Sequence, residues 1–116
     1  MRIGIVTRSE YEYAAHARAG RRAGMTDADV ARILSGPGSG GDAVEDALLR
    51  ATDELFEDDV VSAATWVTLA KSMDTRQLLD VLIAVGGYRS TSMLINCAGV
   101  QIDDNMADFR FPPALR

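Results

Sequence analysis

Helix-start signals recur along the whole chain and constrain its fold more than any other feature. Serine, threonine or aspartate precedes a stretch of helix-periodic apolar residues at five places, namely Ser9, Thr26, Asp42, Ser62 and Asp74. Such side chains accept hydrogen bonds from the free N–H groups of a first helical turn. The only flexible stretch is residues 35–41, SGPGSGG, and no pair of alternating segments indicates a β-hairpin. The sequence therefore predicts an all-α protein, a small bundle of about five helices.

The helix ends follow from glycine and from apolar periodicity. Gly24 is expected to end the first helix at Arg22 or Ala23, because glycine adopts the left-handed conformation that closes many helices. The last helix is the longest, and the Gly86–Gly87 pair in its middle is expected to permit a close helix contact or a bend. Trp66, in the helix that follows Ser62, is expected in the core.

The two ends of the chain are less regular. Residues 1–7 alternate poorly, so a short strand and the tail of a helix both stay open. Residues 101–116 contain two adjacent prolines and two phenylalanines, and we expect an extended arm that packs either on its own chain or on a neighbouring subunit. The 116 residues suffice for one domain with one modest core.

Composition and charge argue against several classes of function. The net charge is −5, and the one small basic cluster cannot reverse that sign, so no nucleic-acid partner is expected. A lone cysteine, Cys97, excludes a disulfide within one chain, and a lone histidine has too few neighbouring ligands for a metal site. We recognise neither a membrane span nor a signal peptide, and so expect a cytoplasmic protein with no membrane partner. No cofactor is expected, because residues 35–41 lack the strand and the Lys-Ser/Thr pair of a phosphate-binding loop.

The stretch from Ser9 to Gly24 holds most of the reactive side chains. Glu12 and His16 are four residues apart and lie on one helical face, where the carboxylate can orient the imidazole for acid–base chemistry. Glu12 also has the capping-box spacing from Ser9, in which the two side chains satisfy the helix start reciprocally. The sequence leaves both roles of Glu12 open. Glu10 also has a second explanation, because the helix dipole favours an acidic residue in a first turn.

The segment SEYEYAAHARAGRRAGMTDADVARIL resembles the carboxymuconolactone decarboxylase family, which belongs to the alkylhydroperoxidase D-like superfamily. The resemblance continues through ALLRATDEL, SAATW and GGYRSTSMLINCAGV, and it covers nearly all of residues 9–100. It implies an alkylhydroperoxidase D-like bundle that assembles as a homo-oligomer, a trimer or a hexamer. It also implies a further helix upstream, so residues 1–8 are interpreted as the remnant of a longer N-terminal region or as the start of a naturally short form.

Two activities occur among the members of this family. One branch carries C-x-x-C-x-x-x-H and reduces peroxides with thiols, and the other decarboxylates a muconolactone by acid–base chemistry. Aligned on His16, the two cysteine positions are Ser9 and Glu12, neither of which forms a disulfide or a sulfenic acid, so a thiol-dependent peroxidase is disfavoured. The resemblance favours decarboxylation or lactone chemistry on a small organic acid, with His16 as general acid–base and Glu12 or Glu10 tuning it.

The residues expected to bind such a substrate are Tyr11, Tyr88, Arg89 and Asn96. An arginine can hold a substrate carboxylate through two parallel hydrogen bonds, although an ion pair between helices explains Arg89 as well. A function of a different class also stays open, namely a non-catalytic oligomeric helical module that has lost the peroxidase cysteines. Turnover that depends on His16 would distinguish the enzyme from the module.

Overall fold

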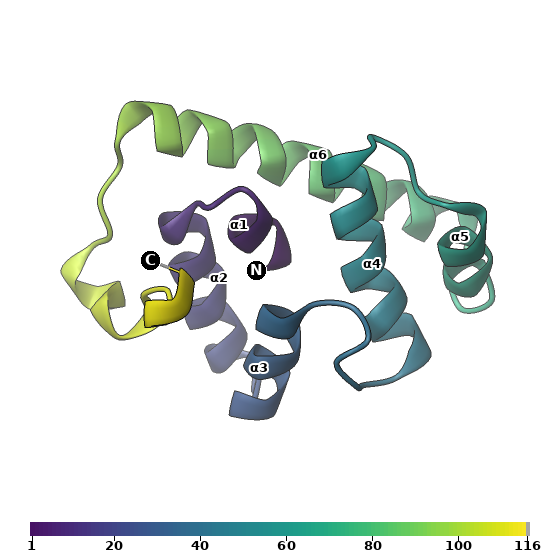
Figure 1. Ribbon diagram of the computed structural model, residues 1–116, viewed down its shortest axis with the longest axis horizontal. Helices are drawn as coiled ribbons and strands as arrows, with labels where there is room; N and C mark the ends of the chain where they lie inside the picture. The colour runs from purple at the N-terminus through teal and green to yellow at the C-terminus, as the bar shows by residue number, and fades with distance from the viewer. Residues whose placement is uncertain (116) are drawn as a thin grey trace.

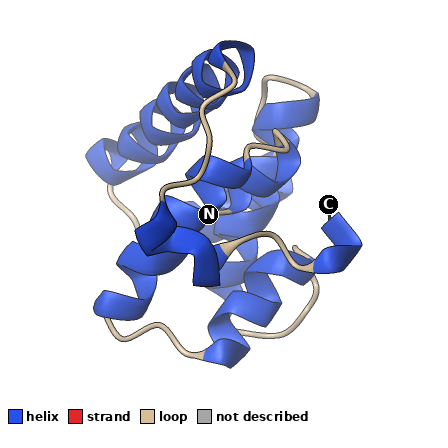
Figure 2. Cartoon of the chain, turned by 90° about the vertical axis from the view of Figure 1, so that its left-hand side faces the viewer, coloured by secondary structure: helices blue, strands red, loops and turns tan. Residues whose placement is uncertain are grey.

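The computed structural model describes residues 1–115, and these residues form helices and loops without a β-strand (Figures 1 and 2). The prediction of an all-α fold is therefore confirmed for the described residues. The elements, in chain order, are α1 (Arg2–Val6), α2 (Glu10–Arg22), α3 (Asp27–Ser35), α4 (Ala43–Glu57), α5 (Ala63–Ala70), α6 (Thr75–Ala98) and the 3₁₀ segments η1 (Asp104–Phe109) and η2 (Pro113–Leu115).

Four of the five predicted helix caps are made by the side chains that the sequence indicates. Thr26 accepts from Asp29 N and completes a capping box at the start of α3, and Asp42 accepts from the first-turn N–H groups of α4. Ser62 caps α5, and Asp74 forms a capping box with Gln77 at the start of α6. These caps involve residues two or three positions apart, so local sequence is sufficient to specify them.

Residues 2–6 form a short helix, α1, which lies between α2 and α4 and also touches α6 (Figure 1). Of the two alternatives left open for the start of the chain, a strand or a helix, the structure shows a helix. Gly4 permits the close approach to α2, because a Cβ at this position would lie 2.8 Å from Tyr13 N. Arg2 ties α1 to the two neighbouring helices: its guanidinium donates to both carboxylate oxygens of Asp53 at 2.7 Å and to two backbone carbonyls at the end of α3.

The C-terminal segment folds back onto its own chain. Residues 104–109 and 113–115 form 3₁₀ turns, so the expectation of an extended arm is wrong. Of the two packing sites that the sequence left open, the arm uses its own chain, where η1 packs on α2. Phe111 is buried against Tyr13 of α2, with ring centroids 4.9 Å apart. A second buried cluster joins α4, α5 and α6 through four residues, Ala47, Ala51, Leu69 and Leu78.

α6 leaves most of its apolar surface uncovered. Only Leu78 and Ser92 are buried along this helix, whereas Ile83 and Leu94 are about seven-tenths exposed. Gly86 and Gly87 have no neighbouring atoms within 4 Å of where a Cβ would stand, so no close helix contact forms there within the chain. By length and composition alone, α6 also qualifies as a helix that could cross a membrane. Trp66 of α5 is 36% exposed, so the expectation that it belongs to the core is wrong.

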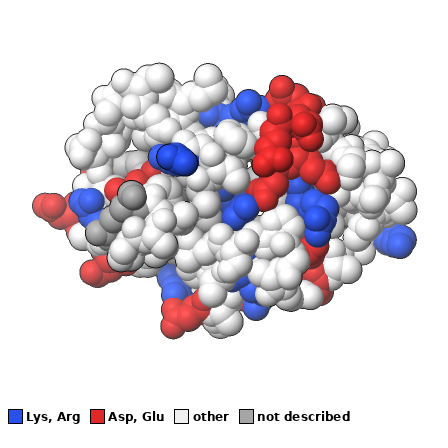
Figure 3. Space-filling view, in the orientation of Figure 1, with Lys and Arg blue, Asp and Glu red and all other residues white. Residues whose placement is uncertain are grey.

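Acidic side chains gather at the C-terminal end of α4. Figure 3 shows them as a patch over this end, where Glu57, Asp58 and Asp59 follow one another and are exposed. Asp59 pairs with Arg89 of α6 at 2.5 Å. The patch therefore contains at least one ion pair that holds α6 to the α4–α5 connection.

Candidate active site

The start of α2 is not closed by the predicted capping box. Ser9 occupies the cap position by its backbone angles, but its side chain makes no capping hydrogen bond, and Glu12 does not reach back to it. The cause lies in α1: the Ser9 N–H, which a capping box would offer to Glu12, already donates to Gly4 O at 2.8 Å. The local closure of α1 therefore takes the N–H that a capping box needs, and Glu12 is left free for another role.

Glu12 is buried and lies beside His16. Its residue is 6% exposed, and its Oε2 is 3.1 Å from His16 Nδ1. Nδ1 also lies 2.9 Å from the carbonyl oxygen of Glu12, and an imidazole nitrogen carries only one hydrogen. The proton on Nδ1 is thus donated to the carbonyl, which explains why Oε2 lies at ion-pair distance but has no hydrogen-bond partner.

One face of α6 runs along this pair. The Tyr88 ring meets the His16 ring edge to face, with centroids 4.7 Å apart, and Asn96 Nδ2 donates to Thr7 O at 3.0 Å. Ser92 lies one helical turn from each of these residues and therefore on the same face of α6, the helix that packs on α1. Its side chain is fully buried, and its Oγ has no hydrogen-bond partner.

Among the described residues, three buried polar atoms remain without a hydrogen bond, Ser9 Oγ and Glu12 Oε2 at the start of α2 and Ser92 Oγ on α6. Buried polar atoms are nearly always paired, and exceptions are found at water sites and catalytic sites. The charge of Glu12 also acts on the Met1 amino group. Burial lowers the pKa of that amine, and the nearby Glu12 opposes the shift.

The other predicted site residues do not meet His16. Glu10 and Tyr11, together with Asn96 of α6, line a separate polar cavity of about 300 Å³. Glu10 accepts from Phe111 N at 3.0 Å, and Tyr11 Oη lies 3.5 Å from an Asp103 oxygen. Arg89 points to the α4 side of α6, because it follows Tyr88 by one residue, or 100° around the helix. There its guanidinium donates hydrogen bonds to Leu55 O and to the Asp59 carboxylate, and it lies over the Phe56 ring. The structure therefore brings His16 together with Glu12 and Tyr88 but not with Arg89.

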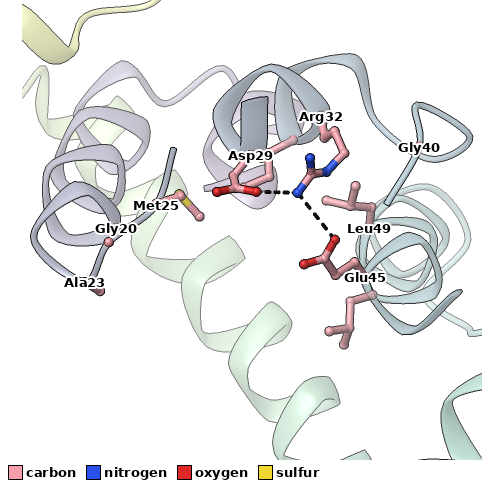
Figure 4. Close-up of a pocket in the computed structure, with 11 residues that line it drawn as sticks. Gly20, Ala23, Met25, Asp29, Arg32, Gly40, Glu45 and Leu49 are labelled. Atoms are coloured by element: carbon pink, nitrogen blue, oxygen red, sulfur yellow. Dashed lines mark hydrogen bonds and ion pairs between the residues drawn. The ribbon is translucent and has the colours of Figure 1, made fainter. Parts of the chain in front are cut away.

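A larger cavity of about 500 Å³ lies between the end of α2, α3 and α4 (Figure 4). Its lining includes Met25, Arg32, Glu45 and Leu49, none of which the sequence indicated as functional. The lining comes from three helices and a glycine-rich loop, so no local motif could have revealed it. Among the described residues, no group of histidine, cysteine, aspartate and glutamate side chains could hold a metal ion.

In comparisons with protein-family models, with curated proteins and with solved structures, the chain matches none of them.

Proposed function

We propose that this protein is a carboxymuconolactone decarboxylase-like enzyme that performs acid–base chemistry on a small organic acid or lactone. One observation carries the proposal. A buried carboxylate oxygen of Glu12 has no hydrogen-bond partner and lies 3.1 Å from the only histidine of the chain. The resemblance of residues 9–100 to that family points to the same histidine.

His16 has the geometry of a general acid–base. Its Nδ1 is engaged by the Glu12 carbonyl, so Nε2, on the opposite edge of the ring, is the nitrogen that can accept or deliver a proton. The side chain is one-third exposed, which permits contact with a small substrate. Decarboxylation leaves a carbanion or enolate that must be protonated, and delivery of that proton is the role proposed for His16. The edge-to-face contact with Tyr88 helps to orient the imidazole ring.

The test uses a panel of small carboxylic acids and lactones, with released CO₂ and lactone opening as the readouts. His16→Ala is expected to lower turnover by roughly 100-fold or more, the usual contribution of a positioned acid–base group. Arg22→Ala changes an exposed side chain of the same helix and serves as the matched control. Undiminished turnover in His16→Ala would refute the role of this residue.

The same panel separates the two other classes of function. A folded protein that turns over none of the compounds would favour the non-catalytic module. Consumption of a hydroperoxide with a dithiol reductant, abolished in Cys97→Ser, would favour a peroxidase. Cys97 is exposed and has no second cysteine in its chain, and the positions that the peroxidase branch fills with cysteine are Ser9 and Glu12.

The proposed enzyme acts as a homo-oligomer in which α6 is covered by another copy. Exposed Ile83 and Leu94, together with the open Gly86–Gly87 surface, offer an apolar and closely approachable helix face. Light scattering after gel filtration should give a multiple of the chain mass, and Leu94→Arg should lower it, whereas Arg22→Glu should not. A monomer that instead partitions into lipid vesicles would contradict this arrangement.

A further inference from the structure

The 500 Å³ cavity is independent of the His16 site and has the make-up of a small-molecule pocket. Its walls are mostly apolar, from Met25, Ile33, Leu48 and Leu49, and neither His16 nor Glu12 lines it (Figure 4). The volume lies in the range of ligand pockets, which combine an apolar lining with a few polar groups. The α2 side is kept open by small residues, Gly20, Ala23 and Gly24.

The polar groups of this cavity form one chain of charges at the α3–α4 side. Figure 4 shows Arg32 between Asp29 and Glu45. Asp29 is saturated, because one oxygen accepts from Arg32 and the other from Thr26 N and Oγ1, both at 2.7 Å. These hydrogen bonds, those from Thr26 first, lower the pKa of Asp29, so this acid carries its charge at neutral pH.

Glu45 is the group with unused bonding capacity. Within residues 1–115 its only charged partner is Arg32, at 3.6 Å, which is outside hydrogen-bond distance, and its side chain is about half exposed. The two carboxylates outnumber the one guanidinium, so the cavity lining carries a net negative charge. A ligand carboxylate would meet an arginine that Asp29 already pairs with, and it would be repelled by Glu45. A ligand cation meets a free carboxylate instead.

We propose that this cavity binds a small organic cation, a primary amine with a compact alkyl or aryl body. The ammonium group donates to the Glu45 carboxylate, and the body lies against Met25, Ile33 and Leu49. The site stands apart from the proposed acid–base function, since no residue is shared between them.

The experiment titrates the full chain with n-hexylamine and, separately, with hexanoate, and follows backbone amide shifts by NMR. The two probes share an alkyl body and differ in the sign of the head group. Hexylamine is expected to give saturable shifts at Met25, Ile33 and Leu49, with an affinity roughly tenfold above that of hexanoate. Glu45→Gln should weaken hexylamine binding by a similar factor.

Two further variants distinguish binding inside the cavity from binding to charges on the protein surface. Glu57→Gln removes a charge from the exposed end of the same helix and should leave the affinity unchanged. Ala23→Phe fills the cavity from the α2 side, where the exposed backbone tolerates a side chain, and should abolish the shifts. Equal binding of both probes, equal binding by wild type and Glu45→Gln, or shifts confined to other residues would overturn the proposal. Loss of the same amide signals on concentrating the free protein, without probe binding, would identify a second copy as the occupant and overturn it too.

Discussion

Replacing Arg2 by methionine should unfold the protein at a markedly lower temperature. The Arg2 guanidinium makes a two-pronged ion pair with Asp53 at 2.7 Å and donates to Ile33 O and Leu34 O at 3.1 Å. The two charged side chains are only 16% and 20% exposed. Methionine keeps the apolar stem of the side chain and removes the guanidinium with its charge, so Asp53 is left largely buried without its partner.

The size of the effect follows from this burial. Breaking a buried pair by removing one partner costs about 3–5 kcal/mol, and because solvent reaches a fifth of Asp53 we expect the lower end, about 3 kcal/mol. At about 4 °C or more per kcal/mol for a domain of this size, the midpoint of thermal unfolding should fall by about 12 °C. The loss combines a missing attraction with an uncompensated buried carboxylate, and the second part is the larger one.

The matched control is Arg50→Met. Arg50 pairs with Asp46 at 2.9 Å across one turn of α4, but its side chain is 46% exposed, and such pairs contribute only about 0.3–0.5 kcal/mol. Scanning calorimetry or circular dichroism gives both midpoints. The double variant Arg2→Met with Asp53→Leu removes the stranded carboxylate and should recover part of the loss. A decrease for Arg2→Met no larger than for Arg50→Met would refute the assignment of α1 as an anchored part of the core.

Two other outcomes follow from the polar groups. Ser92→Ala should raise the unfolding free energy by about 1 kcal/mol, because it removes a buried hydroxyl without a partner, and a decrease measured by urea titration would show that the hydroxyl is bonded. Burial raises the pKa of Glu54, but hydrogen bonds from Ser62 and Thr65 outweigh it with help from Arg50, so the net pKa lies below 4.5. The resulting stability is present above that value and is lost as the pH falls through the folded-state pKa, so Glu54→Gln should be less stable than wild type at about pH 6, and the difference should shrink as the pH falls below 4.5. A constant difference between the two proteins across this range would contradict the assignment.

The candidate site was predictable only in part. The i, i+4 spacing of Glu12 and His16 placed them on one face, and the measured 3.1 Å agrees with that prediction. Tyr88, 72 positions after His16, was predicted as a substrate-binding residue without any indication that its ring would meet the imidazole. Arg89 was predicted in the same role, but it pairs with Asp59, because adjacent residues on a helix point in different directions.

The sequence alone determined the helical class and most helix starts. The caps at Thr26, Asp42, Ser62 and Asp74 depend on bonds between residues at most three apart, and such bonds need no other part of the chain. Gly24, with φ of +96°, likewise follows α2 where local geometry requires it.

Only the tertiary structure decided the burial of Glu12 and the contact of His16 with α6. The capping box at Ser9 does not form, because the Ser9 N–H donates to Gly4 O at the end of α1, five residues earlier, and this bond is itself local. No local motif gives the burial of Glu12, which is 6% exposed, or the contact between the His16 and Tyr88 rings. Both depend on packing between helices, and α1 is held in that packing by the ion pair between Arg2 and Asp53, which are 51 positions apart.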